Sequence, residues 1–379
     1  MKILLTGIDG YCGWPLALAI SKKFKNCRII GVDNLSRRKW VKMLNCTSAI
    51  PIKSMYQRIK IAKKFGFKNI NFIYGDLTDA HFTRDLFKKF DFDIVIHCAS
   101  QPSAPYANSS LLKASFTLKN NNLSLLNLLW SIKEFGKKNI KLINTSTTGV
   151  YGQPNFKIPE GFLKIKNQGS DLIPFSNLGG SWYHITKSND LNNLHLANRM
   201  WGLKIVDMRT AIVFGVSTNE TNLHSDLNTR FDFDFNFGVV INRFCAMSAI
   251  DYDLTVYGKG LQKRPFISLK DFVKSIVNLI NYKQKKSFEV FNQTSQLLTI
   301  RYLAETIVKN AKKIGSKSNL KMIKNPRVEK EKHNMKMENK LFINMLKSEP
   351  VLFKDESIHI IKTLLRYKNK LTKYKKSFI

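Results

Sequence analysis

The run MKILLTGIDGYCG, residues 1–13, decides the fold class of this 379-residue chain. Its first part, Lys2–Thr6, is a short apolar run typical of a buried strand. Three glycines follow at a spacing of three, Gly7, Gly10 and Gly13, and a helical pattern begins directly after them. A strand, a glycine-rich turn and a helix in this order present backbone N–H groups and the positive end of a helix to phosphates. We therefore predict a dinucleotide-binding βαβ unit at the start of the chain.

Short apolar runs and longer helical patterns alternate along the first 214 residues. The runs typical of strands are Lys2–Thr6, Arg28–Val32, Asn71–Tyr74, Asp93–Cys98, Lys141–Thr145 and Lys204–Met208. The helical patterns between them are Trp14–Phe24, Ala80–Phe90, Leu123–Phe135 and Tyr183–Met200. Strands that alternate regularly with helices pair in parallel. The pattern thus predicts an α/β fold with a doubly wound parallel sheet, the Rossmann fold.

Asp33, at the end of the second predicted strand, indicates which dinucleotide binds. Its carboxylate can accept hydrogen bonds from both adenosine ribose hydroxyls, and it would repel a 2′-phosphate, so NAD is favoured. Arg37 and Arg38 follow closely and weaken this exclusion. Asp76, after the third strand, is a candidate for the adenine edge. We also assign Asn34, Arg37 and Leu77 to the cofactor site.

A second, smaller region is expected after residue 214, where the regular alternation stops. We expect residues 1–214 to form the NAD-binding domain and residues 215–379 to form mainly a C-terminal substrate-binding lobe. The polar and aromatic stretch 219–237 predicts a loop that closes over the ligand. Asp271–Asn281 and Glu289–Phe291 resemble a helix and a strand, so residues 266–293 are expected to return to the first domain.

The composition indicates a protein of a reducing compartment with a sizeable core. Hydrophobic residues make up 44% of the chain. The five cysteines are scattered without a CxxC pair, so we expect neither a disulfide framework nor a metal site, and a cytoplasmic location fits. No apolar stretch is long enough for a transmembrane segment, and we expect no targeting segment before Lys2–Thr6.

The formal net charge of +35 has two interpretations. Because lysine is spread along the whole chain, a solvated basic surface is favoured over a nucleic-acid site, and we expect no nucleic-acid partner. Anionic substrates would still be attracted by this charge. Only Lys368–Lys376 is densely basic, and we favour a solvated end over a weak membrane contact.

Tyr183 and Lys187 form a Tyr-x-x-x-Lys pair within a predicted helix. Residues four apart share one helix face, so the ammonium of Lys187 can stabilise a Tyr183 phenolate that takes a proton from a hydroxyl group. Lys187 can also hold the nicotinamide ribose. Thr147 follows the fifth strand, at the edge of the sheet where ligands bind, and its hydroxyl can reach the same substrate oxygen. We therefore predict Thr147, Tyr183 and Lys187 as catalytic residues.

These motifs together resemble the extended short-chain dehydrogenase/reductases that act on nucleotide sugars. Longer strings are similar to the UDP-sulfoquinovose synthases in particular, and they occur in order across roughly residues 1–335. The strings are Asp9–Trp14, Val32–Leu35, Ser103–Tyr106, Ile132–Gly136, Tyr183-His184, Asn242–Cys245, Leu254–Gly260, Val290–Gln293 and Asn325–Glu329. The resemblance implies UDP-glucose and sulfite as substrates, UDP-sulfoquinovose for sulfolipid head groups as product, and a tightly held NAD that is transiently reduced through a 4-keto intermediate. Similar enzymes are usually homodimers.

The resemblance also implies roles for individual side chains. His184 is the candidate acid and base for the chemistry at C5 and C6, because the pKa of an imidazole suits proton transfer near neutral pH. Arginines suit a diphosphate. The candidate substrate-binding residues are Gln101, Asn242, Arg243, Gln262, Arg264 and Arg327.

Two positions depart from the pattern of these synthases. Pro102 stands where the family has an arginine, and Thr148-Gly149-Val150 stands where it has Met-Gly-Glu. Sugar 4,6-dehydratases carry Asp-Glu directly after the threonine, so dehydration of that kind is disfavoured here. A UDP-sugar 4-epimerase, or another NAD-dependent enzyme that modifies nucleotide sugars, stays open as the alternative. A non-catalytic binding protein is disfavoured by the intact Thr147, Tyr183 and Lys187.

Overall fold

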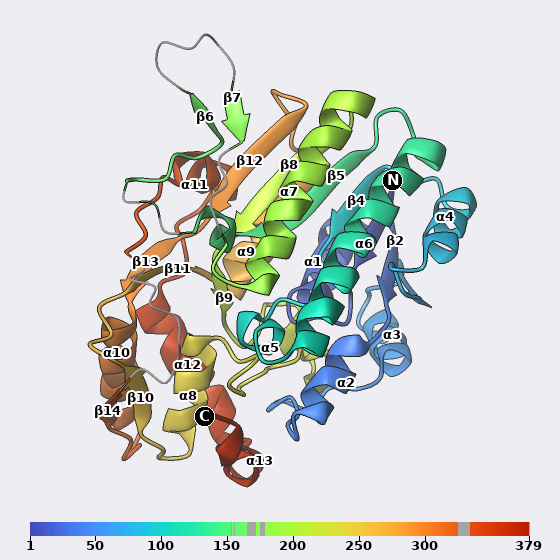
Figure 1. The fold of residues 1–379 in the computed structure, drawn as a ribbon. Helices are drawn as coiled ribbons and strands as arrows, with labels where there is room; N and C mark the ends of the chain where they lie inside the picture. Colours follow the sequence, from blue (N-terminus) through green and yellow to red (C-terminus); the bar gives the residue numbers. More distant parts are fainter. Residues whose placement is uncertain (153, 155, 165–171, 175–178, 325–333, 379) are drawn as a thin grey trace.

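A seven-stranded parallel sheet forms the centre of the molecule (Figure 1). The computed structural model describes residues 1–152, 154, 156–164, 172–174, 179–324 and 334–378. The strand order is β12-β8-β5-β4-β1-β2-β3. These strands are β1 (Lys2–Thr6), β2 (Arg28–Asp33), β3 (Ile70–Tyr74), β4 (Ile94–His97), β5 (Lys141–Thr147), β8 (Lys204–Thr210) and β12 (Phe288–Gln293). The predicted doubly wound α/β fold is confirmed.

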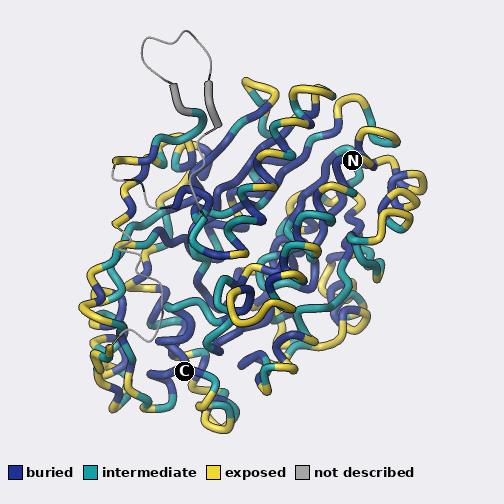
Figure 2. The backbone as a smooth tube through the Cα atoms, in the orientation of Figure 1, coloured by how far each residue is buried: buried dark blue, intermediate teal, exposed yellow. Residues whose placement is uncertain are grey.

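Helices cover both faces of this sheet because each strand is apolar on both sides. Alternate residues of β1 divide between two cores: Ile3 and Leu5 face one, and Leu4 faces the other. The first core is closed by α1 (Gly13–Lys23), α3 (Met55–Lys64), α9 (Leu269–Ile280) and α11 (Lys340–Leu346). The second is closed by α4 (Ala80–Lys89), α6 (Leu111–Phe135) and α7 (Trp182–Trp201). Figure 2 shows the strands buried beneath partly exposed helices.

Helix ends differ from their predicted positions where the sequence is polar. Helix α6 begins twelve residues before the predicted Leu123, since it starts at Leu111. Its first half is rich in Asn and Lys, which hides the apolar periodicity, but Ser110 marks the start by accepting a hydrogen bond from the Lys113 N–H. Helix α7 matches its prediction to one residue at each end, because Ser181 caps its start and Gly202, at φ 68°, ends it.

A lobe with its own apolar core follows the sixth strand of the main sheet along the chain. Its helices are α8 (Val240–Ala249), α10 (Ile300–Lys312), α12 (Phe353–Leu365) and α13 (Lys368–Lys373), and α2 (Ser36–Met43) packs against it. Its strands are β9 (Ile212–Phe214), β11 (Lys263–Ser268) and β13 (Gln296–Thr299), with the pair β10 (Leu254–Tyr257) and β14 (Leu320–Ile323). The hairpin β6 (Phe162–Lys164) and β7 (Leu172–Pro174) lies outside the lobe core, whereas the short helix α5 (Ala104–Ala107) contributes Tyr106 to it.

The stretch 219–237, predicted as a closing loop, is built from short 3₁₀ turns and extended backbone. Phe231 and Phe233 are fully buried in the lobe core, while the intervening Asp232 points to arginines instead. Residues 231–237, which we call the strap, therefore place Phe side chains on one side, in the lobe core, and charged side chains on the other. Among the described residues, no helix is long and apolar enough to cross a membrane.

The basic C-terminal tail is packed against the lobe rather than freely solvated. Leu371 and Phe378 are buried, although the lysines between them are exposed. The Phe378 ring meets Phe233 edge-on at a centroid distance of 5.5 Å, and the Ser377 carbonyl accepts a hydrogen bond from the Phe235 N–H at 2.7 Å. The tail thus supports the strap 231–237 from behind.

We predict that Phe378→Ala lowers the free energy of unfolding by about 3 kcal/mol, because it leaves a cavity beneath the strap. Urea unfolding of the purified variants measures this. Phe65→Ala is the control, since that ring is 41% exposed, and it should cost less than about 1 kcal/mol. Equal losses from the two variants would contradict the packing described here.

Candidate active site

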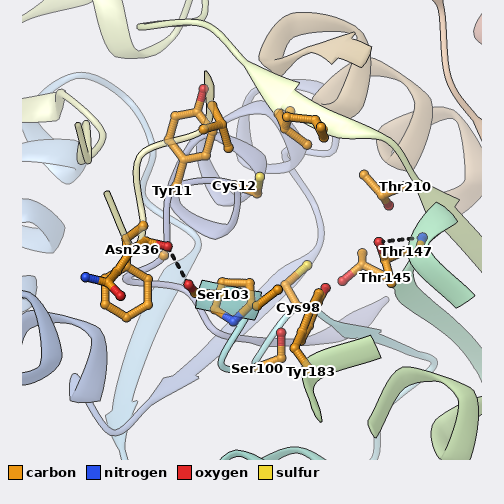
Figure 3. A pocket seen from close by; sticks show the side chains of 18 of the residues that line it. Tyr11, Cys12, Cys98, Ser100, Ser103, Thr145, Thr147, Tyr183, Thr210 and Asn236 are labelled. Carbon is orange, nitrogen blue, oxygen red and sulfur yellow. Dashed lines mark hydrogen bonds between the residues drawn. The ribbon is translucent and has the colours of Figure 1, made fainter. Parts of the chain in front are cut away.

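A large cleft runs along the carboxyl edge of the sheet, and its volume of about 570 Å³ suits a small-molecule site. It lies over the topological switch point between β1 and β4, where the connections after the two strands run to opposite sides of the sheet. Ligands bind at this point in such sheets. One wall comes from the turns that follow β1, β2, β4 and β5. The other wall comes from the lobe, through residues 235–240, Arg243 and residues 262–265. Figure 3 shows the polar side chains that meet there.

The glycine-rich turn forms a cradle that only glycine allows. A Cβ added at Gly13 would lie 2.0 Å from the Gly7 carbonyl oxygen, and one at Gly10 would lie 3.0 Å from it. Gly7 has φ 75°, and its own Cβ would lie 2.8 Å from the Ala99 nitrogen. All three glycines line the cleft at the start of α1. The turn therefore fits the pyrophosphate of a dinucleotide.

Asp33, at the end of β2, and Asp76, which follows β3, both line the cleft. Asp33 accepts hydrogen bonds from the backbone N–H groups of Asp9, at 2.9 Å, and Leu35, at 2.7 Å. Burial and the nearby charge of Asp9 raise the pKa of Asp33 to about 6. Asp76 accepts a hydrogen bond from the Asn34 amide at 3.0 Å, so the three predicted residues form one connected group.

Arg37 and Arg38, which we expect to weaken the exclusion of a 2′-phosphate, each contact a carboxylate in the structure. Arg37 lines the cleft but donates through Nε and Nη2 to Asp232, at 3.1 and 2.8 Å. Arg38 donates through Nε and Nη2 to the two oxygens of Asp9, each at 2.7 Å. Each guanidinium is therefore paired with a carboxylate, but Nη1 of Arg37 has no hydrogen-bond partner among the described residues, so the effect of the two arginines on a 2′-phosphate stays a prediction.

Thr147 and Tyr183 meet in the cleft as predicted (Figure 3). Thr147 ends β5, and its hydroxyl oxygen accepts a hydrogen bond from the Gly149 N–H at 3.1 Å. Tyr183 lies in the first turn of α7. Burial raises the pKa of Tyr183, whereas the positive charge of Lys187 and a hydrogen bond with Thr147 lower it. Lys187 and Thr147, the two residues predicted to assist Tyr183, are thus the ones that lower the pKa of its phenol.

Lys187 lies one helical turn after Tyr183 but faces the interior. Its side chain is 2% exposed, and its Nζ is 3.0 Å from Oδ2 of Asp190. It is not among the residues that line the cleft. Lys187 therefore acts on Tyr183 through its charge from below the cleft floor.

His184 points into the cleft beside Tyr183, with ring centroids 5.2 Å apart. The Ser181 hydroxyl lies 3.0 Å from Nδ1 of His184. A Cβ added at Gly149 would lie 2.3 Å from Nε2, so the imidazole occupies the space that this glycine leaves open. Burial and the positive charge of Arg264 lower the pKa of His184 to about 4. At neutral pH the ring is therefore a neutral proton acceptor.

The predicted substrate-binding residues separate into three groups. Arg243, Gln262 and Arg264 line the cleft. Arg327 lies outside the described residues. Gln101 and Asn242 do not line the cleft, and their role in substrate binding stays a prediction.

Gln101 is fully buried, and its amide donates to the Thr117 hydroxyl at 2.8 Å and to the Ser103 carbonyl at 3.1 Å. Asn242 uses its amide oxygen to accept the Gly215 N–H at 3.1 Å. Both amides support the walls of the cleft from behind.

The two departures also have definite places. Pro102 lines the cleft, so the family's arginine has no counterpart at this point of the wall. Val150 is fully buried in a small apolar cluster with Ile158 and Met337, and it does not line the cleft. Replacing the family's glutamate by Val150 therefore changes the buried cluster and not the lining of the cleft.

Several supporting residues were not predicted. Asp9 is 1% exposed and is bound by both Arg38 and Arg58, whose side chain is fully buried. Asp232 bridges Arg37 to the strap, and no signal in the sequence joins positions so far apart. The partner of Lys187 could have been found, because Asp190 stands three residues later on the same helix.

Comparison with known proteins agrees with this geometry. The sequence profile of the NAD dependent epimerase/dehydratase family matches residues 3–292. The chain belongs to this family. Within it, the chain is 38% identical to UDP-sulfoquinovose synthase, chloroplastic, of Spinacia oleracea over 334 residues, which is 88% of this chain and 69% of that protein. It is 36% identical to UDP-sulfoquinovose synthase of Sulfolobus acidocaldarius over 379 residues, which is 99% of this chain and 95% of that protein.

Solved structures of epimerases share the fold of this family member. The UDP-glucose 4-epimerase of Thermotoga maritima superposes with a TM-score of 0.71 at 20% identity, covering 98% of this chain and 100% of that one. The UDP-glucuronic acid 4-epimerase of Bacillus cereus, in complex with UDP-glucuronic acid and NAD, superposes with a TM-score of 0.68 at 21% identity, covering 98% and 100%. The predicted fold is thus confirmed, and membership of the NAD dependent epimerase/dehydratase family confirms NAD as the cofactor.

We predict that Gly149→Ala reduces turnover about 100-fold, because the new methyl group displaces the His184 ring from the cleft. The backbone of Gly149 is not left-handed, so alanine itself is tolerated there. The control is the same change in a His184→Ala background, where the space is empty and no further loss is expected. A full additional loss in that background would show that Gly149 acts without His184.

Proposed function

We propose that this chain is a UDP-sulfoquinovose synthase, which converts UDP-glucose and sulfite to UDP-sulfoquinovose with NAD held in the glycine cradle. One observation carries the proposal: two proton-transfer groups, Tyr183 and His184, face one cleft beside the cradle. A sugar that is altered at both C4 and C6 needs two such groups. The similarity to two synthases over most of their length supports the same assignment.

Binding of the sugar nucleotide would use the lobe wall. Arg264 and Arg243 place guanidinium groups along the cleft, which suits a diphosphate, and Gln262 adds an amide. The opposite wall, with Thr147 and Tyr183, would receive the hexose. The ligand would then lie between a basic wall and the catalytic helix.

Tyr183 starts the chemistry in this scheme. Its ionised phenol, stabilised by Lys187 and Thr147, takes the proton of the sugar 4-hydroxyl. The cradle of Gly7, Gly10 and Gly13 would hold the NAD, which would supply the acceptor and later the donor of the C4 hydride. The resulting 4-ketone acidifies the neighbouring C5–H.

His184 acts next because it is neutral and accepts protons. It removes the C5 proton and returns a proton to the C6 hydroxyl, so water leaves and a C5–C6 double bond conjugated with the ketone forms. Sulfite adds through sulfur to C6, and C5 regains a proton. The net change replaces the C6 hydroxyl by a sulfonate and releases one water.

A UDP-sugar 4-epimerase is the alternative, and one observation favours it. Pro102 offers no cationic group at the position where these synthases carry an arginine, which weakens the case for an anionic nucleophile there. Epimerisation at C4 would need Tyr183 but would leave His184 without a task. The variant of His184 therefore separates the two functions.

The test is turnover of purified protein, with the co-purifying dinucleotide identified by mass spectrometry. We expect bound NAD, formation of UDP-sulfoquinovose from UDP-glucose and sulfite, and a loss of at least about 1000-fold in Tyr183→Phe. His184→Ala should stop the reaction after oxidation at C4. Conversion of UDP-glucose to UDP-galactose without sulfite, unaffected by His184→Ala, would instead establish the epimerase.

We further propose that two copies associate through α6 and α7, which lie side by side in Figure 1. Leu126, Trp130, Leu196 and Met200 on these helices are between 37 and 66% exposed, an unusual amount of apolar surface on one face. The Trp130 ring also contacts Trp201 across the two helices, at a centroid distance of 5.0 Å.

Light scattering of the purified protein should give the mass of a dimer, and Leu196→Lys should shift it toward the monomer. Leu223→Lys is a matched control, since Leu223 is 51% exposed but lies outside this face. A monomeric unmodified protein, or dissociation by the control alone, would contradict this assembly.

A further inference from the structure

The ammonium of Lys187 has one carboxylate partner that the mechanism above does not use. Nζ of Lys187 lies 3.0 Å from Oδ2 of Asp190, and the two side chains are 2% and 1% exposed. An ammonium buried this deeply is stable only beside a negative charge. Since the pair stands three residues apart on α7, Asp190 lies directly behind the catalytic lysine.

The Asp190 carboxylate is itself held from the neighbouring helix α6. Its second oxygen, Oδ1, accepts a hydrogen bond from the Asn122 amide at 3.1 Å. The same amide nitrogen donates to the Thr186 carbonyl at 2.9 Å. Asn121, the next residue of α6, donates to the Thr186 hydroxyl at 3.0 Å. The orientation of Asp190 is thus determined by packing between α6 and α7.

Other titratable groups face Lys187 from the sheet, and they are already engaged. Asp207 of β8 accepts a hydrogen bond from the Asn144 amide at 2.8 Å and lies beside Arg209. His97, at the end of β4, has its Nδ1 within 2.9 Å of the Thr6 hydroxyl, and burial lowers the pKa of His97 to about 3.

Cys98, which also feels the charge of Lys187, has its pKa raised to about 12 by burial. His97 and Cys98 are therefore both uncharged near neutral pH. Asp190 is the carboxylate that contacts the ammonium directly, at 3.0 Å.

We infer that Asp190 is a positioning residue for the reaction, which keeps the Lys187 ammonium charged and fixed one turn below Tyr183. This inference rests on the proposed function, in which Tyr183 is the base. Burial alone would lower the pKa of Lys187, but Asp190, together with the charges of Tyr183 and Asp207, raises it above its ordinary value. The same negative charge opposes ionisation of Tyr183. Asp190 therefore raises both the pKa of Tyr183 and the pKa of Lys187. These two pKa values bound the pH range in which the phenolate and the ammonium coexist.

The test is the pH dependence of kcat for Asp190→Asn. The acid limb reports ionisation of Tyr183, and the alkaline limb reports loss of the Lys187 proton. Removing the negative charge makes both ionisations easier, so both limbs should move to lower pH by about one unit. Asp190→Glu, which restores the charge, should return both limbs to their original positions.

Glu356→Gln is the matched control for a structural role. It removes another buried carboxylate, 4% exposed and 2.7 Å from Lys270, at a distance from the cleft floor. It should lower the melting temperature as Asp190→Asn does but leave the limbs in place. If Asp190→Asn does not fold, Asn122→Leu releases Oδ1 of Asp190, and the limbs should move in the same direction by a smaller amount.

Unmoved limbs in a folded Asp190→Asn protein, or in Asn122→Leu where only that variant folds, would overturn the inference. That failure is distinct from failure of the proposed function, because Tyr183→Phe reports on the base alone. An inactive Tyr183→Phe with unmoved limbs in Asp190→Asn rejects only the positioning role. An active Tyr183→Phe rejects the mechanism itself.

Discussion

Charges that are buried at the carboxyl edge of the sheet must be paired, and this constraint organises the whole site. Asp9 and Asp232 are buried, so leaving either carboxylate unpaired would cost several kcal/mol. Asp9 meets Arg38 and Arg58, and Asp232 meets Arg37. These pairs join the glycine turn, α2, α3 and the strap from the lobe into one structure around the cleft. The same rule beneath α7 keeps a lysine ammonium close to the catalytic tyrosine.

The local parts of the site could be predicted from the sequence. The glycine turn depends on backbone approach within 13 residues, and a helix brings Tyr183 and Lys187 to one side by its own geometry. The strands of the main sheet were predicted within two residues at each end, because a strand buried on both faces needs a continuous apolar run. In these cases the interactions that determine the structure lie close together in the chain.

The parts that could not be predicted depend on where side chains point after distant segments pack. Gln101 and Asn242 are candidate substrate-binding residues, yet their amides bind groups of the protein itself. The Gln101 amide donates to the Thr117 hydroxyl, and that of Asn242 accepts the Gly215 N–H and donates to the Tyr11 hydroxyl. Arg37 is held by a carboxylate 195 positions away, a contact that no local pattern contains. The strap alternates Phe and Asp with a strand-like period, but it was assigned to a closing loop because its charged partners were unknown.

The environment of His184 explains how one scaffold can serve different reactions on sugars. In 4,6-dehydratases the carboxyl groups after the threonine supply the acid and the base, whereas here Thr148 and Gly149 supply neither. Gly149 instead leaves room for an imidazole that enters from α7, and Ser181 fixes its inner nitrogen. Burial and the charge of Arg264 lower the pKa of His184, so the ring is neutral near pH 7, and Arg264 lines the cleft that an anionic ligand would enter. In the proposed function the group that takes the C5 proton would thus stand on α7, one residue after Tyr183, rather than at the end of β5.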